Sequence, residues 1–336
     1  MWSGSELEGM DGVDAVGHRI VHGGTEFVEP VVIDTDVVRR LEALADLAPL
    51  HQPKSLQALE LVEKALPEVP AVACFDTAFH AHLPAAAATY ALPREWRARW
   101  PLRRFGFHGL SHAYASRRAA ELAGAPLEEL RIVTCHLGAG ASLAAVLGGR
   151  SVDTTMGFTP LEGLVMATRS GSVDPGLILW LEEHMGMPPS ELASTLEHRS
   201  GLAGLTGTSD MKAILEAEAA GDDTAHLAVE VYLHRLRGEI ARMAAALGGM
   251  DVLVFTGGVG ERAAAIRARA AEGLAFLGVE IDAARNDVAE PDADIGSGRV
   301  RAFAIAARED LEIVRGVRSA LRRRMGRLAL EDNEHG

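Results

Sequence analysis

Cysteine, positive charge and long apolar runs are all scarce in this sequence, and each shortage excludes a class of protein. Only two cysteines occur among 336 residues, Cys74 and Cys135, both inside apolar runs, so we expect buried reduced thiols and no disulfide framework. No uninterrupted apolar stretch approaches about 18 residues, so no membrane-spanning helix is expected. The first twelve residues are acidic and lack the basic start of a signal or transit peptide. We therefore expect a cytoplasmic protein.

Positive charge is outnumbered by negative charge, at 33 Lys and Arg against 47 Asp and Glu, for a net charge of −14. The basic residues are scattered apart from residues 322–324, which argues against a nucleic-acid partner. A composition that is 48% hydrophobic and 24% charged is typical of a globular protein and excludes global disorder. At about 150 residues per domain, the length predicts two domains.

Three common chemical motifs are also missing. The sequence contains neither the GxxxxGK[ST] phosphate loop nor the GxGxxG dinucleotide fingerprint, which disfavours the standard P-loop and Rossmann interpretations. No HxxxH or HxH spacing in the sequence includes a carboxylate, so a histidine metal site is disfavoured as well.

The hydrophobic periodicity predicts a mixed α/β organisation. Short apolar runs at AVGHRIVHGG and PAVACFDT are typical of strands that hand over to functional loops. From residue 131, three strands joined by glycine turns predict a β-meander, and DVLVFTGGVGE predicts a strand, a glycine turn and then a helix that begins after Glu261. Residues 201–208 are expected to form a loop. Helices are predicted at residues 34–47, 55–66, 225–247, 262–278 and 311–328.

Two glycine-rich stretches could bind phosphate. In LVFTGGVGE the glycines let backbone N–H groups approach a nucleotide, and the following helix N-terminus favours anions. In HLGAGAS the small residues and Ser142 could cradle a phosphate, with a hydrogen bond from His136. An ordinary strand-to-helix turn and an ordinary tight hairpin explain these stretches equally well when each is taken alone.

Arginine and histidine recur beside glycine and turn residues, as in HRIVHGG, FHG and TRSG. Such loop-borne groups at strand ends indicate anion binding, although a single histidine is more often a packing residue and a single arginine a solvated one. Asp76 and Glu309 each follow an apolar strand-like run, which makes them candidate Mg²⁺ ligands or positioning groups.

Taken together and in order, these segments resemble the acetokinase family of the actin, sugar-kinase and Hsp70-type ATPase superfamily. The resemblance extends from about Val16 to Arg315. It rests on VGHRIVHGG, APLHQP, FDTAFH, RRFGFHGLSHAYAS, HLGAGASLAAVLGGRSVDTTMGFTPLEGLVMATRSGSVDPG, SGLAGLTGTSDMK, VFTGGVGER and GLAFLGVEID.

The resemblance implies an α/β, two-domain actin-like ATPase fold with duplicated βββαβαβα topology. Residues 1–77 would form a first domain, truncated at its N-terminus, with residues 311–336 packing back on it, and residues 78–310 would form the nucleotide-binding domain. The implied activity is that of a kinase in organic acid metabolism and acetyl-CoA biosynthesis: reversible transfer of the ATP γ-phosphoryl group to acetate, giving acetyl phosphate and ADP. Mg²⁺, or alternatively Mn²⁺, would assist, and a cytoplasmic homodimer is implied.

Matching positions also assign roles to individual residues. Acetate is already ionised at neutral pH, so catalysis reduces to positioning and charge neutralisation. The resemblance gives catalytic roles to Arg19, Asp76, His108 and Arg169, metal binding to Glu309, and substrate binding to Arg19, Val21, Leu50, Phe107 and Pro160. It gives nucleotide binding to His136, Gly138, Gly140, Asp210, Gly257, Gly258 and Gly260.

The sequence also departs from the family pattern. It holds no Asn-x-Gly-Ser-Ser-Ser phosphate loop, and Ala139 and Arg262 stand where the family has asparagine. One hypothesis is an active small-acid kinase, for acetate or alternatively propionate, whose recorded start lies downstream of the true one. The other is a catalytically impaired protein that binds nucleotide or a protein partner.

Overall fold

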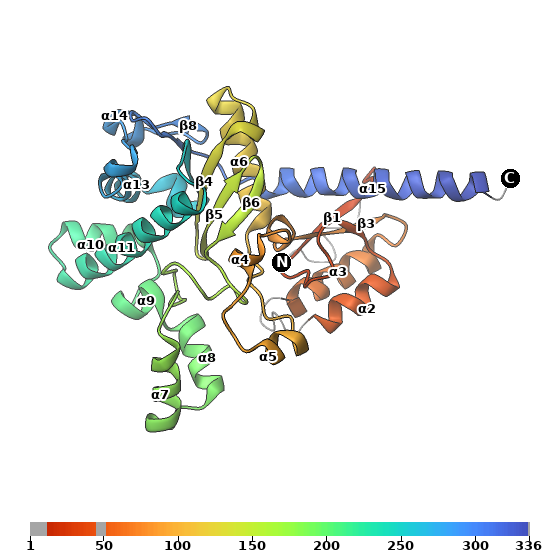
Figure 1. The fold of residues 1–336 in the computed structure, drawn as a ribbon, viewed down its shortest axis with the longest axis horizontal. Coiled ribbons are helices and arrows are strands. Elements are labelled where there is room, and N and C mark those ends of the chain that lie inside the picture. Colours follow the sequence, from red (N-terminus) through yellow and green to blue (C-terminus); the bar gives the residue numbers. More distant parts are fainter. Residues whose placement is uncertain (1–11, 45–51, 335–336) are drawn as a thin grey trace. The chain divides into compact units, whose positions relative to one another are not determined.

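The computed structural model describes residues 12–44 and 52–334, and the chain divides into two compact units (Figure 1). Unit 1 comprises Met1–Ala81, Phe107–Tyr114 and Arg308–Gly336, and unit 2 comprises His82–Gly106 and Ala115–Ala307. The domain boundaries expected from the sequence stay a prediction. No described helix is both long enough and apolar enough to cross a membrane.

Unit 1 is built on a three-stranded sheet in the order β1-β3-β2. The central strand β3 runs parallel to β1, with Arg19 opposite Cys74, and antiparallel to β2. The strands are β1 (Val16–Ile20), β2 (Val31–Val32) and β3 (Ala71–Phe75), and the helices are α2 (Thr35–Ala43), α3 (Gln52–Ala65), the 3₁₀ helix η2 (Ala78–His80) and α15 (Glu309–Glu334).

The side chains of β3 alternate between two apolar clusters, as a strand covered on both faces requires. Ala73 and Phe75 pack with Leu41 of α2, whereas Val72 and Cys74 pack with Ala320 of α15. The sheet is therefore held rigidly on both sides. β1 ends just after Arg19 and β3 ends just before Asp76, so the core fixes the backbone from which those two side chains project.

Unit 2 contains a six-stranded sheet in the order β6-β5-β4-β7-β9-β8. The first three strands form the antiparallel meander that the glycine turns predict, while β4, β7 and β9 run parallel. The strands are β4 (Arg131–Leu137), β5 (Ala141–Leu147), β6 (Arg150–Thr154), β7 (Val252–Thr256), β8 (Ala293–Asp294) and β9 (Arg301–Ala304).

Helices surround this second sheet. The longest of them in unit 2, α11, contacts β4, β5 and β6 through a continuous apolar face that includes Val229, Leu233, Leu236 and Ile240. The helices are α4 (Ala85–Ala88), α5 (Arg94–Arg99), α6 (Gly109–Ala123), which begins in unit 1, η3 (Leu127–Glu129), α7 (Pro175–Met185), α8 (Pro189–His198), α9 (Gly201–Thr206), α10 (Met211–Ala219), α11 (Asp223–Ala246), α12 (Gly257–Arg262), α13 (Ala264–Glu272), η4 (Ala275–Leu277) and α14 (Ala283–Asp287).

Two local predictions are wrong. The helix after β7 begins at Gly257, without an intervening turn, because Gly257 adopts φ +77° and lies where a Cβ would be 3.0 Å from the Leu137 backbone. The expected loop at residues 201–208 contains α9, whose first residue Gly201 has φ +60° and lies against the carbonyls of Met166 and Arg169. In both cases glycine permits an abrupt helix start that periodicity does not reveal.

The two cysteines are buried and free, as predicted. Burial raises the pKa of the Cys74 thiol to about 12 and that of Cys135 further still. Both thiols are therefore protonated at neutral pH and act as small apolar groups.

Candidate functional site

In unit 1, Arg19 and Asp76 form a forked ion pair at the ends of neighbouring parallel strands. Arg19 Nε and Nη2 donate to Asp76 Oδ1 and Oδ2 over 3.0 and 2.6 Å, and the Asp76 N–H donates to the Ile20 carbonyl. The Asp76 side chain is 2% exposed but that of Arg19 is 39% exposed, so the pair has a buried acidic end and an open basic end. The Asp76 carboxylate raises the pKa of Arg19, and burial opposes this rise. Arg19 therefore stays charged at any working pH.

Glu309 completes this cluster from the opposite end of the chain. It is the first residue of α15, and its Oε2 lies 3.1 Å from Arg19 Nη1. Burial raises the pKa of Glu309, and the nearby Asp76 carboxylate adds to this rise, while Arg19 opposes it. We call Arg19, Asp76 and Glu309 the Arg19 cluster. With both carboxylates ionised it carries one excess negative charge.

His108 and Phe107 precede α6 and are tied to the same strand end. The Gly109 N–H donates to the Asp76 carbonyl over 2.9 Å, and a Cβ at Gly109 would collide with that oxygen, so only glycine fits here. His108 adopts φ +55°, a left-handed conformation that is costly for a residue with a side chain and that recurs at functional sites. The first turn of α6 thus holds His108 beside Asp76 along the backbone.

Histidines also lie beneath these residues. His80 Nε2 is 3.1 Å from the Phe107 carbonyl oxygen. The His22 and Phe107 rings pack edge to face, with 5.5 Å between their centroids. Burial lowers the pKa values of His22 and His80 to about 4, so both are neutral at pH 7. For these two histidines, the packing interpretation that the sequence left open is favoured over anion binding.

In unit 2, Arg169 presents a contrasting guanidinium. Its Nη1 donates to the Pro160 carbonyl over 2.8 Å and lies 3.6 Å from the Met166 sulfur. Across residues 12–44 and 52–334, no carboxylate forms an ion pair with it. Burial lowers the pKa of Arg169, with a weaker opposing effect of Glu197. A partly desolvated cation held only by neutral atoms is a favourable seat for an anion.

A cavity of about 650 Å³ opens elsewhere in unit 2. Its lining comes from the β4–β5 hairpin, the starts of α10 and α12, and α11. Three of the predicted nucleotide-binding residues line it, namely Gly138, Asp210 and Gly258. The other lining residues are Ala139, Ala167, Leu202, Ser209, Met211, Lys212, Leu215, Glu216, Ala219, Tyr232, Val259, Arg262 and Ala263.

The remaining predicted nucleotide residues lie behind this lining. His136 is opposite Thr256 in the β4–β7 pairing, and Gly257 packs against Leu137 at the start of α12. The Gly138 N–H donates to the Gly140 carbonyl over 3.0 Å, which closes the hairpin tip. His136, Gly140, Gly257 and Gly260 therefore shape the backbone around the cavity without lining it.

The glycine-containing helix α12 is held from behind by a buried arginine. Arg267 Nη1 donates to the carbonyls of Gly260 and Glu261 over 3.0 and 2.7 Å, while Nε donates to Asn286 Oδ1 over 2.7 Å. At the other end of α12, the Thr256 hydroxyl is buried and finds no hydrogen-bond partner among the residues that the structure describes. Thr256 is fully buried and lies outside the cavity lining, so it belongs to the support of α12.

Some cavity residues escaped the sequence analysis. Met211 and Lys212 follow Asp210 directly, and the Lys212 N–H donates to Asp210 Oδ1 over 3.0 Å, so the capping of α10 places all three together. The run TSDMK carries a capping signal that could have extended the prediction to Lys212. Tyr232 lies in the middle of α11, and nothing in the local sequence distinguishes it from a core residue.

The predicted substrate pocket is divided among different parts of the chain. Val21 and Phe107 belong to unit 1, at the end of β1 and before α6, and Pro160 belongs to unit 2. Leu50, like the neighbouring His51, lies outside the described residues. The pocket therefore stays a prediction.

The Arg19 cluster is the part of unit 1 that fits Mg²⁺. Proteins usually hold this ion through one or two carboxylates together with water and substrate phosphates, and Asp76 and Glu309 supply two carboxylates with excess negative charge. Within residues 12–44 and 52–334, no group of three or more His, Cys, Asp or Glu side chains forms a complete metal cage. The donor set thus suits an ion that arrives with a phosphate ligand.

Comparison with known proteins adds an independent finding. The model of the acetokinase family matches residues 4–315. The chain is similar to an acetate kinase of Microcystis aeruginosa, at 50% identity over 306 residues that cover 90% of this chain and 76% of that protein. It is also similar to one of Clavibacter michiganensis subsp. michiganensis, at 51% identity over 304 residues that cover 90% and 77%.

Solved structures agree with these relatives. A Porphyromonas gingivalis acetate kinase superposes with a TM-score of 0.87 at 39% identity, covering 92% of this chain and 78% of that one. A Francisella tularensis propionate kinase gives a TM-score of 0.86 at 39% identity, covering 90% and 78%. The two sheets described above thus have the mixed α/β, actin-like ATPase fold that the sequence predicts.

Proposed function

Because this chain belongs to the acetokinase family, we propose that it transfers the γ-phosphoryl group of ATP reversibly to acetate, giving acetyl phosphate and ADP. The observation that carries the proposal lies in unit 2, where a cavity of about 650 Å³ with a glycine-lined wall accompanies the Arg169 guanidinium, which forms no ion pair with any described carboxylate. The cavity is large enough for a nucleotide. Arg169 supplies a charge for a phosphoryl group.

The chemistry asks for charge management more than for a strong base. An acetate oxygen attacks the γ-phosphorus, the bond from that phosphorus to the bridging oxygen breaks, and ADP leaves with the electron pair, so no proton is transferred. Arg19 and His108 orient the carboxylate substrate, and Arg169 stabilises charge on the equatorial phosphoryl oxygens. A rigid Arg19, held by two carboxylates, loses little freedom when substrate binds.

The nucleotide occupies the cavity of unit 2 in this proposal. Gly138 and Gly258 let the backbone approach the phosphates, while Lys212 and Arg262 place positive charge in the lining. Arg262 stands where the family has asparagine, and it retains a donor while adding charge. His136, Gly140, Gly257 and Gly260 support the surrounding backbone.

Asp76 and Glu309 would hold the divalent cation, either directly or through water. When bound, Mg²⁺ neutralises charge on the nucleotide phosphates. Mn²⁺ favours a similar oxygen donor set and is expected to substitute. Titration with Mg²⁺ should therefore restore activity to metal-depleted protein, and Asp76→Asn should raise the concentration that is needed.

The acyl substrate is a small carboxylic acid. The family resemblance assigns an apolar substrate pocket to Val21, Leu50, Phe107 and Pro160, and in such a pocket one additional methylene changes binding by about 1–3 kcal/mol. Similarity to both acetate kinases and a propionate kinase leaves propionate as the second substrate to test. Trapping the acyl phosphate with hydroxylamine, in parallel reactions with ATP and each acid, gives the ratio of kcat/KM values. A larger value for propionate would overturn the assignment of acetate.

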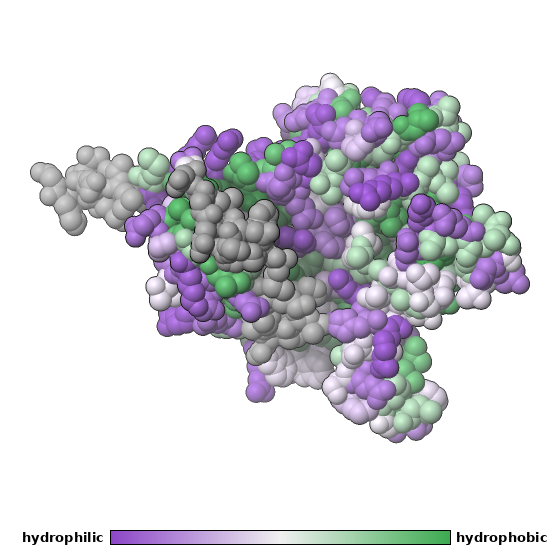
Figure 2. Space-filling model, turned by 180° about the vertical axis from the view of Figure 1, so that it is seen from behind, coloured by the Kyte–Doolittle hydropathy of each residue, from purple (hydrophilic) through white to green (hydrophobic). Residues whose placement is uncertain are grey.

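We propose that the protein forms a homodimer, and the exposed apolar surface of α7 supports this proposal. This helix reads PGLILWLEEHM and buries none of its residues, with Leu179 56% and Trp180 49% exposed. Figure 2 shows apolar surface along the α7–α8 pair at the lower right. α7 packs only lightly, against α8, and an apolar helix that leaves its large side chains exposed is typical of a self-association surface.

Light scattering after size exclusion tests the dimer. Leu179→Asp should give a monomer, whereas Leu227→Asp, at an equally exposed leucine of α11, should leave the oligomeric state unchanged. A wild-type chain that stays monomeric at micromolar concentration would contradict the proposal.

The competing hypothesis is a protein that binds nucleotide without turnover. It predicts that ADP binds to the unit 2 cavity while no acyl hydroxamate forms from ATP and acetate. The kinase proposal predicts hydroxamate formation that Arg169→Ala abolishes, a control that also excludes a contaminating host kinase. Binding without product would favour the competing hypothesis.

A further inference from the structure

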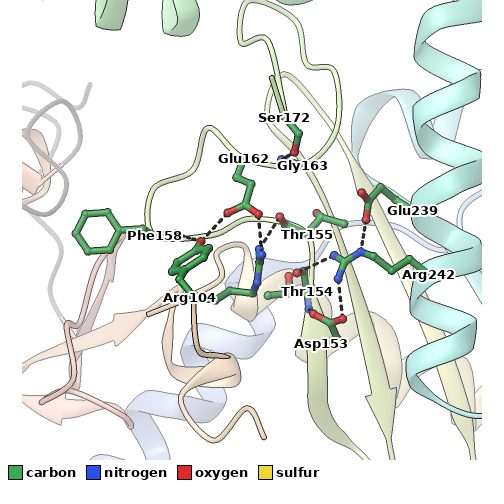
Figure 3. A network of polar contacts seen from close by, with 11 residues as sticks. Arg104, Asp153, Thr154, Thr155, Phe158, Glu162, Gly163, Ser172, Glu239 and Arg242 are labelled. Carbon is green, nitrogen blue, oxygen red and sulfur yellow. Dashed lines mark hydrogen bonds and ion pairs between the residues drawn. The ribbon is translucent and has the colours of Figure 1, made fainter. Parts of the chain in front are cut away.

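A polar cluster lies at the base of the loop that carries Pro160 and Arg169. It consists of Tyr90, Arg104 and Glu162, which we call the Glu162 cluster, and Figure 3 shows Glu162 pointing at the Arg104 guanidinium. All three residues belong to unit 2. None of them has a role in the proposed reaction, although residues 155–172 connect β6 to the helices that follow and include a proposed catalytic arginine.

Both oxygens of Glu162 are engaged. Oε2 accepts from the Tyr90 hydroxyl over 2.6 Å, and Oε1 accepts from Arg104 Nη2 over 2.7 Å. The partners in turn hold the loop backbone, because Arg104 Nη1 donates to the Thr155 carbonyl over 2.9 Å and the Phe158 N–H donates to the Tyr90 hydroxyl over 2.9 Å. The Glu162 carboxylate is thus the shared acceptor of a hydrogen-bond network that holds the first part of the loop in place.

The backbone at Gly157 packs too closely against the Glu162 cluster to admit a side chain. A Cβ on Gly157 would collide with both Glu162 Oε2 and the Tyr90 hydroxyl, and the Phe105 N–H donates to the Gly157 carbonyl over 3.0 Å. Burial, reinforced by the hydrogen bond to Glu162, raises the pKa of Tyr90, so its hydroxyl remains a donor. The first part of the loop is therefore fixed through Glu162.

Hydrogen bonds connect this anchored part of the loop to Arg169 over a few residues. Pro160, two residues before Glu162, accepts from Arg169 Nη1 over 2.8 Å. Immediately after Glu162, the Gly163 N–H donates to Ser172 Oγ and the Ser172 N–H donates to the Gly163 carbonyl, each over 3.0 Å. Arg169 lies within this closed segment, so both its backbone and the carbonyl that orients its guanidinium depend on the position of residues 160–163.

We propose that Glu162 is a positioning residue, which aims the Arg169 guanidinium by fixing the Pro160 carbonyl through Tyr90 and Arg104. The inference rests on the proposed role of Arg169 in phosphoryl transfer. A displacement of about 1 Å at a reacting group can cost on the order of 10²-fold in rate. Glu162→Gln keeps the size of the side chain and removes its charge, so kcat/KM for acetyl phosphate should fall about 10- to 100-fold. The KM for ADP should be unchanged.

Unit 2 also provides a matched control. Arg242 donates to Asp153 Oδ2 and Glu239 Oε2, each over 2.7 Å, in a second cluster that Figure 3 also shows. The Glu239 side chain is 25% exposed against 36% for Glu162, so Glu239→Gln removes an equally or more buried carboxylate beside an arginine. Among the described residues, Glu239 forms no hydrogen bond or ion pair with residues 155–172, although Arg242 also donates to the Thr154 carbonyl over 3.1 Å. Because Thr154 is held in β6 by strand pairing, Glu239→Gln should leave kcat/KM unchanged.

A double-mutant cycle separates positioning from a general loss of stability. If Glu162 acts through Arg169, Glu162→Gln should have little further effect in an Arg169→Lys background, where the guanidinium fork is already lost. Full additivity of the two losses would overturn the proposal, as would wild-type kinetics for Glu162→Gln. If Glu162→Gln does not fold, Tyr90→Phe removes one of the same hydrogen bonds and should produce the same split between kcat/KM and the KM for ADP.

Hydrogen exchange supplies a readout that does not depend on turnover. Glu162→Gln should speed exchange of the amides in residues 157–172, and Glu239→Gln should not. If wild type shows no phosphoryl transfer, the proposed function fails while this exchange pattern still tests the anchoring. Unchanged exchange in Glu162→Gln would overturn the positioning role.

Discussion

Arg19 in unit 1 and Arg169 in unit 2 are assigned to the same kind of task, yet their surroundings have opposite signs. Two carboxylates hold Arg19, and Asp76 raises its pKa, whereas Arg169 is hydrogen-bonded to a neutral carbonyl and pairs with no carboxylate of the described residues, and burial lowers its pKa. Arg19 is neutralised before any substrate arrives. A bound anion would provide Arg169 with a direct charge partner. The difference indicates that Arg19 chiefly fixes geometry, while Arg169 chiefly stabilises charge.

The largest effect is expected at Arg169. Arginines that stabilise a transferring phosphoryl group are worth about 10³ to 10⁵ in kcat, so Arg169→Ala should lower kcat by at least about 10³-fold. Arg169→Lys should recover only a small part of this loss, since a lysine lacks the planar fork. Steady-state kinetics in the direction of ATP formation measure both variants. Similar kcat values for Arg169→Ala and wild type would remove the distinction between the two arginines.

The next effect is expected at the buried end of the Arg19 pair. Asp76→Asn removes the forked acceptor and should lower kcat/KM for the acyl substrate about 10²-fold. Because Arg19 is partly exposed, the loss in the free energy of unfolding should be modest, at about 1–3 kcal/mol.

A surface pair in the same unit serves as the control for Asp76→Asn. Asp36 is paired with Arg39 and Arg40 at an exposed position of α2, and Asp36→Asn should leave stability nearly unchanged because solvent screens the pair. Denaturant titration of both variants gives the comparison. Equal losses at the two sites would show that burial of Asp76 has no energetic consequence.

Acid should distinguish the two units as well. The pKa values of His22 and His80 fall to about 4 in the folded protein and that of His18 falls too, so the unfolded chain binds protons more readily below about pH 6.5. Their contribution to stability is complete above that pH and is lost as the pH falls toward 4. The raised pKa of Glu309 acts in the opposite sense. The net loss between pH 7 and pH 5 should be on the order of 2 kcal/mol.

Hydrogen exchange at pH 7 and pH 5 tests this difference. Among the described residues the buried histidines all belong to unit 1, so amides of β1 and β3 should lose protection before those of β4 and β7. Simultaneous loss in the two sheets would mean that histidine burial does not set the acid sensitivity.

The smallest effects concern two adjacent glycines of α12. Gly257→Ala places a side chain at φ +77° against the Leu137 backbone and should cost about 1–2 kcal/mol of stability. Gly258→Ala meets no atom within 4 Å but adds a methyl group to the lining of the cavity, so it should raise the KM for ADP and leave the melting temperature unchanged. Thermal unfolding and nucleotide kinetics on both variants separate the two roles. A reversal of the two phenotypes would contradict the placement of the cavity.

Local patterns predict those parts of the fold and site that depend on neighbouring residues. The meander of β4, β5 and β6 follows from alternating apolar runs and glycine turns, and Arg19 and Asp76 are recognisable as strand-end residues. The pairing of Arg19 with Glu309 is not recognisable in this way, because it joins residues that only the packing of α15 brings together. For the same reason, Tyr232 and the Glu162 cluster carry no sequence signal.

The errors have a common physical origin. Both missed helix starts, at Gly201 and Gly257, occur where glycine takes a positive φ because a neighbouring backbone approaches too closely for a Cβ. Such a glycine looks like a turn residue in sequence, since the close approach comes from a distant segment. Predicting these starts would require knowledge of the tertiary packing.

The roles assigned to these residues all require the chain to exchange a phosphoryl group between a small acyl phosphate and a nucleotide. The most direct measurement is ATP formation by the purified 336-residue chain supplied with acetyl phosphate, ADP and Mg²⁺. ATP should appear in step with the loss of acetyl phosphate. Binding of ADP with acetyl phosphate left intact would contradict it.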